Sequence, residues 1–119
     1  MKVEFDGRIT QCHKRLHKIL KGMGFQVVDN YEADQYRIDC FVTELNKGFE
    51  ADGKGYHWKN RDAKRDEYIL NKFGIPIMRI PEALLNGRSD ERVRELIREF
   101  VETEDLRLKG ANYDIQREN

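Results

Sequence analysis

The sequence YRIDCFVTELNKGFEAD, residues 36–52, decides the fold because it reads as two short strands joined by a turn. On each side of the polar TELNK segment, side chains of alternating character follow the two-residue period of a β-strand. Asp39 projects from the first strand, while Glu50 and Asp52 lie one pleat apart on the second and point to the same face. The stretch therefore predicts an antiparallel hairpin with three carboxylates near one end of the sheet.

Working outward from this hairpin, hydrophobic spacing and turn residues predict the remaining elements. They are a helix over 9–22, a strand over 25–28, a polar turn over 29–34, a helix over 61–73, a strand over 75–80, a helical turn over 81–87 and a last helix capped by Ser89. In the helix over 61–73, the expected buried side consists of Tyr68, Ile69, Leu70 and Phe73. The order α-β-β-β-α-β-α predicts an α/β domain with a mixed sheet flanked by helices. We expect one domain over 1–106 and a polar C-terminal tail over 107–119.

Composition excludes several classes of protein. With 22 basic and 22 acidic residues, the overall charge does not by itself predict a nucleic-acid partner. We expect no membrane partner, because no apolar run approaches membrane-spanning length and the N-terminus lacks the apolar stretch of a signal peptide. Cys12 and Cys40 stand alone, which indicates neither a zinc knuckle nor a disulfide framework and favours a reduced, cytoplasmic setting.

The first helix has a local basic face. Residues 9–23 contain four cations and no acid, namely Lys14, Arg15, Lys18 and Lys21. Such a face suits a phosphate backbone, but charge alone favours an ordinary solvated helix face. His13 and His17, one helical turn apart, could in principle bind a soft metal; because no third ligand stands beside them in sequence, we assign them to the cationic face.

The three carboxylates of the hairpin have the ligand chemistry of a hard cation. Oxygen ligands gathered without cysteine suit Mg²⁺ or Mn²⁺. Close negative charges in a partly buried place are costly unless a cation neutralises them. The alternative is an exposed polar strand face on which each acid is simply hydrated, and spacing alone does not decide between the two.

Further titratable residues follow the hairpin. His57 lies in the Gly-flanked loop GKGYHW and could accept a proton from water or contact a phosphate; a surface histidine is the plainer alternative. Asp62, Arg65 and Asp66 share one side of the next helix. They could form a local ion pair or lean back over the acidic site.

The run from YRIDCFV through FEADGKGYHW to GIPIMRI resembles the PD-(D/E)xK restriction-endonuclease-like superfamily. The likeness is greatest to its very-short-patch-repair branch and to the related Glu-Asp-x-His-Asp homing endonucleases. It rests on a succession of short motifs in register, over about residues 9–100. They are the helix TQCHKRLHKILKGMGF, Arg37-Ile38-Asp39, Glu50-Ala51-Asp52-Gly53, His57, Arg65-Asp66 and Gly74-Ile75 through Arg79-Ile80.

The resemblance implies a nuclease-like domain and a role for each matching residue. Asp39 would be the principal metal ligand, Glu50 and Asp52 would complete the Mg²⁺ or Mn²⁺ site, and His57 would be the general base or contact the phosphate. Asp66 would position water or His57. Two positions depart from the pattern: Asp52 stands where the motif lysine would fall, with Lys54 two residues late, and His13 replaces the glutamate of the first helix.

The sequence therefore favours a metal-dependent DNA endonuclease or nickase that hydrolyses phosphodiester bonds, in the cytoplasm of a prokaryotic or phage-infected cell. Its expected substrate is double-stranded DNA, with a specificity that is low or is supplied by a homodimer or a partner protein. The residues expected to contact nucleic acid are Lys14, Arg15, Lys18, Lys54, Lys59, Arg61, Lys64 and Arg65. The alternatives are a catalytically inactive nucleic-acid- or protein-binding module on the same fold and a structural domain with an exposed acidic patch.

Overall fold

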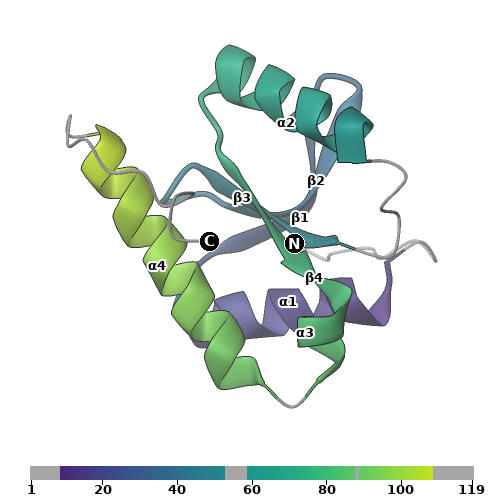
Figure 1. Cartoon of the computed structure of the whole chain (residues 1–119), viewed down its shortest axis with the longest axis vertical. Helices are drawn as coiled ribbons and strands as arrows, with labels where there is room; N and C mark the ends of the chain where they lie inside the picture. The colour runs from purple at the N-terminus through teal and green to yellow at the C-terminus, as the bar shows by residue number, and fades with distance from the viewer. Residues whose placement is uncertain (1–8, 53–58, 88, 109–119) are drawn as a thin grey trace.

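The computed structural model describes residues 9–52, 59–87 and 89–108, without the side chains of Lys59, Asn60 and 104–108. Figure 1 shows a central sheet between two helical layers. The elements are α1 (Gln11–Gly22), β1 (Val27–Ala33), β2 (Tyr36–Val42), β3 (Lys47–Asp52), α2 (Lys59–Phe73), β4 (Ile77–Pro81), α3 (Glu82–Asn86) and α4 (Asp90–Leu108). The predicted α/β class, element order and mixed sheet are confirmed.

The sheet has the strand order β1-β2-β3-β4. The first three strands form an antiparallel meander, and β4 lies parallel to β3 after the crossover through α2. Helix α2 covers one side, and α1, α3 and α4 lie on the other (Figure 1). This arrangement brings the end of β3 beside the helix that immediately follows it in sequence.

Two hydrophobic clusters fill the spaces between these layers. The larger cluster, against α1, α3 and α4, consists of Cys12, Leu16, Ile19, Leu20, Cys40, Val42, Phe49, Ile80, Leu85, Val93 and Ile97. The smaller cluster, on the α2 side, consists of Ala33, Ile38, Phe41, Ile69 and Ile75. Ile38 and Cys40 thus pack on opposite sides, so the regular alternation predicted along 36–42 breaks between them.

Helix α1 has clear signals at both ends. The Thr10 hydroxyl accepts a hydrogen bond from the backbone N–H of His13 (3.1 Å), so Thr10 is the N-cap. At the other end Gly24 adopts a positive φ of 94°, which a residue with a side chain adopts only at a cost. The helix therefore starts two residues later than the predicted boundary and ends where predicted.

The polar turn predicted over 29–34 is wrong. Strand β1 continues through Val27–Ala33, and Asp29 pairs with Cys40 of β2. Asn30 makes this possible by adopting a left-handed conformation (φ 52°), which asparagine tolerates better than most residues. The actual turn lies at Asp34, whose φ is also positive at 59°.

Two further expectations about the helices need correction. On α2, Ile69 is buried, but Tyr68, Leu70 and Phe73 are 36–42% exposed because the helix contacts the sheet along a narrow stripe. Helix α4 extends to Leu108, beyond the predicted domain boundary at 106, and residues 109–119 lie outside the described part. None of the described helices is long and apolar enough to cross a membrane.

Candidate active site

The candidate site forms where β2 and β3 separate. Their backbone pairing ends at Cys40 and Phe49, so the next two residues, Asp39 and Glu50, lack a regular ladder. Their side chains take its place: Glu50 Oε2 accepts a hydrogen bond from the Asp39 N–H (2.9 Å), and Asp39 Oδ2 accepts one from the Ala51 N–H (3.0 Å). These reciprocal bonds hold two of the three predicted carboxylates at the opening between the strands.

Arg65 reaches into this opening from α2. Its Nη2 donates a hydrogen bond to Glu50 Oε2 (2.9 Å) and another to the backbone carbonyl oxygen of Arg37. The Arg65 side chain is 16% exposed, and its guanidinium lies 5.8 Å from the centre of the Tyr36 ring. Arg65 was predicted to contact nucleic acid, but the structure turns it inward because buried Glu50 needs a positive partner.

Burial and neighbouring charge act together on Glu50. Desolvation raises the pKa of its carboxyl, and the negative charge of Asp39 raises it further, while Arg65 and the Asp39 N–H oppose the change. The balance is a raised pKa despite the ion pair. Glu50 therefore sits in a place that a divalent cation would make more favourable, whereas Asp39, with 28% of its side chain exposed, remains open to solvent.

A second group of carboxylates surrounds Arg79 on β4, the strand neighbour of Glu50. Asp66 receives two hydrogen bonds from the guanidinium (2.8 and 2.9 Å), and Asp52 and Asp62 approach Nη1 at 3.6 and 3.5 Å. Burial lowers the pKa of Arg79, but the bonds to Asp66 and the nearby negative charges raise it overall. Both arrangements left open for the α2 side chains occur: Arg65 Nη1 lies 3.9 Å from Asp66 Oδ1, and the side chains also lean over the acidic site.

The structure thus divides the predicted carboxylates into two groups. Asp39 and Glu50 each accept a hydrogen bond from the backbone of the other's strand, while Asp52, with 42% of its side chain exposed, turns toward Arg79. Among the described residues, three potential ligand atoms lie within 4.8 Å of one another at His13, Asp29 and Cys40, and not at the predicted trio. The strand separation explains this, because it keeps Asp52 outside the reciprocal bonds.

The placement of His13 and His17 on the cationic face is wrong. His13 is 4% exposed, and both imidazoles contact Asp29, with His13 Nε2 2.8 Å and His17 Nδ1 3.0 Å from Oδ1. The Cys40 thiol lies 3.7 Å from the same oxygen. Sequence reasoning missed Asp29 because it stood in a segment assigned to a turn. The segment itself gave no clear signal, because Asp29 and Asn30 are polar residues that usually mark turns.

The remaining predicted residues fall into three groups. Lys14 and Lys18 on α1 are exposed, as are Arg61 and Lys64 on α2. Arg15 is half-buried and donates to Asp90 at the start of α4 (2.9 Å). Residues His57 and Lys54 lie outside the described residues, and so does the Lys59 side chain.

The basic side of α1 borders a groove of about 820 Å³ between α1, α3 and α4. Four of its lining residues are cationic and one is acidic: Lys14, Arg15, Lys18 and Arg94, with Asp90. Positive charge therefore predominates along it, which is the condition for attracting a phosphate backbone.

A comparison with solved structures shows what this arrangement of elements resembles. The catalytic domain of the homing endonuclease I-Bth0305I superposes with a TM-score of 0.61 at 17% sequence identity, covering 79% of this chain and 96% of that domain. The two share a fold. No protein-family profile and no curated protein sequence matches the chain. The mixed α/β fold expected from the sequence is therefore one that this domain shares, and the superfamily and its branch stay predictions.

Proposed function

We propose that the protein is a metal-dependent DNA endonuclease or nickase that hydrolyses phosphodiester bonds. The observation that supports this most is the pairing of Asp39 with Glu50 at the opening between β2 and β3, within a fold shared with a homing-endonuclease catalytic domain. A binding module needs no pair of acids beside a phosphate, because like charges repel it.

The residues at the opening fit a hard divalent cation. Asp39 and Glu50 would hold Mg²⁺ or Mn²⁺ through carboxylate oxygens, and exposed Asp52 at the end of the same strand is the proposed third ligand. The raised pKa of Glu50 supports this fit, because burial beside Asp39 leaves a negative charge that Arg65 does not fully offset. When bound, such an ion polarises the phosphoryl oxygen and stabilises the leaving oxyanion.

The chain's own residues supply orientation and proton transfer. Arg65 fixes the Glu50 carboxylate, and Arg79 fixes Asp66 and Asp52 at the neighbouring strand end. His57, which lies outside the described residues, is the proposed base: it takes the proton of the attacking water as the new P–O bond forms and the P–O bond to the leaving oxygen breaks. Asp66, bound twice to Arg79, is proposed to position Arg79 and through it Asp52.

One observation favours the alternative of an inactive binding module on the same fold. Glu50 already has a cationic partner in Arg65, and Arg79 pairs with three further acids, so four of the carboxylates have an arginine partner without a metal. In that case the basic groove beside α1, rather than the acids, would bind nucleic acid.

A plasmid-nicking assay separates the two functions. We expect nicking of supercoiled DNA in Mg²⁺ or Mn²⁺ and none in chelator, with loss of at least about 100-fold in Asp39→Asn and in His57→Ala. The matched control is Asp34→Asn. This variant removes an exposed acid in the turn between β1 and β2 that pairs with Lys72. Folded wild-type protein that cleaves neither supercoiled, linear nor single-stranded DNA would contradict the nuclease and favour the binding module.

A further inference from the structure

A polar cluster lies inside the molecule between α1 and the hairpin. His13 and His17 come from α1, Asp29 from β1 and Cys40 from β2. The Asp29 carboxylate stands at its centre and is 1% exposed, with the His13 Nε2 atom 2.8 Å from Oδ1. Burying a carboxylate beside two imidazoles and a thiol costs free energy unless every polar atom has a partner.

The second carboxylate oxygen of Asp29, Oδ2, is the atom of this cluster that lacks a hydrogen-bond partner. His17 Nδ1 forms a hydrogen bond with Oδ1 (3.0 Å) and approaches Oδ2 at 2.8 Å as an ion-pair contact. Oδ2 is buried with no hydrogen-bond partner among the described residues. A buried carboxylate oxygen without a donor is unusual and calls for a positive ligand.

We propose that His13, Asp29 and Cys40 form a structural site for a Zn²⁺ ion, separate from the carboxylate pair of the proposed nuclease centre. Their ligand atoms, the His13 Nε2, an Asp29 oxygen and the Cys40 Sγ, all lie within 4.8 Å of one another. Nitrogen, oxygen and sulfur ligands of this kind are those of Zn²⁺. His17, with 26% of its side chain exposed, lies at the rim and positions Asp29.

The distances suit this ion after small adjustments. Zinc bonds of about 2.0–2.3 Å in a tetrahedron place the ligand atoms roughly 3.3–3.7 Å apart. The Cys40 Sγ to Asp29 Oδ1 distance of 3.7 Å already matches, and the His13 Nε2 to Oδ1 distance of 2.8 Å needs to open by about 0.5 Å.

The proton balance is simple. The Cys40 thiol loses its proton to solvent as sulfur binds the ion, and His13 binds through the lone pair of Nε2 while its proton resides on Nδ1. Burial and the charge of Asp29 raise the pKa of the thiol when no ion is present, so the ion must displace that proton. Nδ1 of His13 lies 4.0 Å from Asp39 Oδ1, and ligating histidines typically direct the second ring nitrogen toward such a carboxylate.

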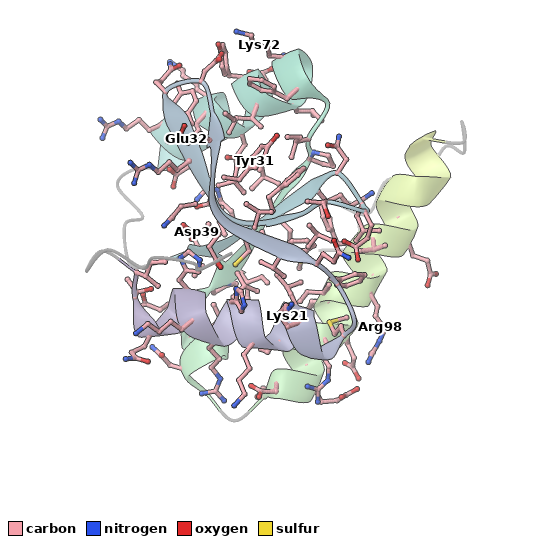
Figure 2. The ribbon with its side chains drawn as sticks, turned by 180° about the vertical axis from the view of Figure 1, so that it is seen from behind. Lys21, Tyr31, Glu32, Asp39, Lys72 and Arg98 are labelled. Atoms are coloured by element: carbon pink, nitrogen blue, oxygen red, sulfur yellow. The ribbon has the colours of Figure 1, made fainter. Side chains whose placement is uncertain are left out.

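Sulfur makes the site distinguishable from the magnesium site proposed above. Thiolate and imidazole favour zinc or cobalt, whereas the Asp39 and Glu50 pair offers oxygen alone and favours Mg²⁺. Figure 2 shows Asp39 on the strand next to α1, and its 4.0 Å distance to His13 makes the two polar groups neighbours. The zinc site would fasten α1 to β1 and β2 at the position where the sheet separates, independently of whether the protein cleaves DNA.

The test uses the full chain, stripped of metal and titrated with Co²⁺ as a spectroscopic substitute for Zn²⁺. We expect one equivalent to produce a thiolate-to-cobalt charge-transfer band and the visible bands of a tetrahedral ion, both removed by added Zn²⁺. Cys40→Ser should abolish the charge-transfer band, and Asp29→Asn should weaken cobalt binding by about 10-fold or more. Cys12→Ser is the matched control, because Cys12 is equally buried but its thiol donates to Asn86 (3.1 Å).

The wild-type protein alone decides the outcome if a variant fails to fold. Folded, metal-free protein that takes up neither Co²⁺ nor Zn²⁺ at one equivalent in equilibrium dialysis would overturn the proposal. A charge-transfer band that survives in folded Cys40→Ser but disappears in Cys12→Ser would also overturn it. Nicking activity enters neither readout, so failure of the nuclease proposal leaves this one unaffected.

Discussion

Glu50 illustrates how a single residue can oppose stability and favour chemistry. It lies 7% exposed beside Asp39, and its pKa is raised by burial first and by that neighbouring charge second. A carboxyl with a raised native pKa binds its proton more tightly in the folded protein than in the unfolded chain. Its ionised form therefore costs stability that metal binding would restore.

We expect Glu50→Gln to be more heat-stable than the wild-type protein at neutral pH in chelator. The wild-type protein loses stability as pH rises above the ordinary value of 4.5 through the raised native pKa, and the amide does not ionise. The difference in melting temperature should vanish at acid pH. Mg²⁺ should raise the melting temperature of the wild-type protein and leave that of Glu50→Gln unchanged. Thermal unfolding followed by circular dichroism measures both.

Glu91→Gln is the matched control with the opposite sign. Arg94 lowers the pKa of Glu91, so its stabilising effect is present above the unfolded value and lost as pH falls. The Gln variant should therefore be equal to or less stable than wild type at neutral pH. A Glu50→Gln protein that is destabilised to the same degree at every pH would contradict the account given for Glu50.

At the residue level, strand alternation was enough to predict that Asp39 and Glu50 meet. It could not predict that Asp52 turns to Arg79, because Arg79 lies on β4, which follows β3 only after α2. In the sheet Asp52 lies opposite Pro81, and Glu50 lies opposite Arg79. Nor could it place Arg65 inward, since an arginine on a helix reads as solvent-facing until the buried acid beside it is known. Contacts between distant segments were the missing information.

Among the elements, β3 depends on a close approach at Gly48. A Cβ atom there would lie 2.6 Å from Ile77 Cδ1 and 2.8 Å from Ile38 Cγ2, which is closer than packed carbon atoms allow. The glycine therefore lets β3 pass between its two neighbouring strands with their isoleucines packed directly over it.

We expect Gly48→Ala to lower the free energy of unfolding by about 1–3 kcal/mol, because both isoleucines must shift. Gly22→Ala is the control, since a Cβ at Gly22 meets nothing within 4 Å and alanine favours a helix, giving no loss or a gain of up to about 1 kcal/mol. Urea unfolding measures both. Equal free energies for Gly48→Ala and wild type would show that the sheet opens to admit the methyl group.

Most elements followed from local patterns, because helix caps, glycines and apolar spacing act over a few residues. Thr10 and Gly24 mark the ends of α1 in this way. Strand β1 did not follow, because Asp29 and Asn30 are polar residues that usually mark turns. Pairing with Cys40 and contact with two histidines override that preference, and neither is visible in the segment itself.

Over the whole molecule, charge is unevenly placed although it sums to zero. The groove beside α1 is lined mainly by cations, and the opening between β2 and β3 by acids. Positive charge placed apart from the acids can attract a DNA backbone, while the potential around the acids stays negative. A neutral chain can therefore still bind nucleic acid.

We expect the double variant Lys14→Gln/Lys18→Gln to bind duplex DNA more weakly at every sequence. In a plot of log affinity against log salt concentration, the slope of the double variant should be shallower by up to about 2, because two phosphate contacts are lost. Lys72→Gln is the control, because Lys72 lies at the end of α2 away from α1 (Figure 2) and pairs with Asp34. Fluorescence anisotropy in increasing KCl measures the slopes. A slope unchanged in the double variant, or decreased equally in Lys72→Gln, would contradict this location.

The left-handed residue in β1 has a consequence for how copies of the protein meet. Among the described strands β1 lies at an edge of the sheet, where unpaired backbone groups can recruit a strand from another molecule. Asn30 interrupts the regular pleat midway along that edge, and the exposed charge of Glu32 lies two residues further on. An incoming strand would lose its register there, so the same irregularity that points Asp29 inward also protects the protein against edge-to-edge aggregation.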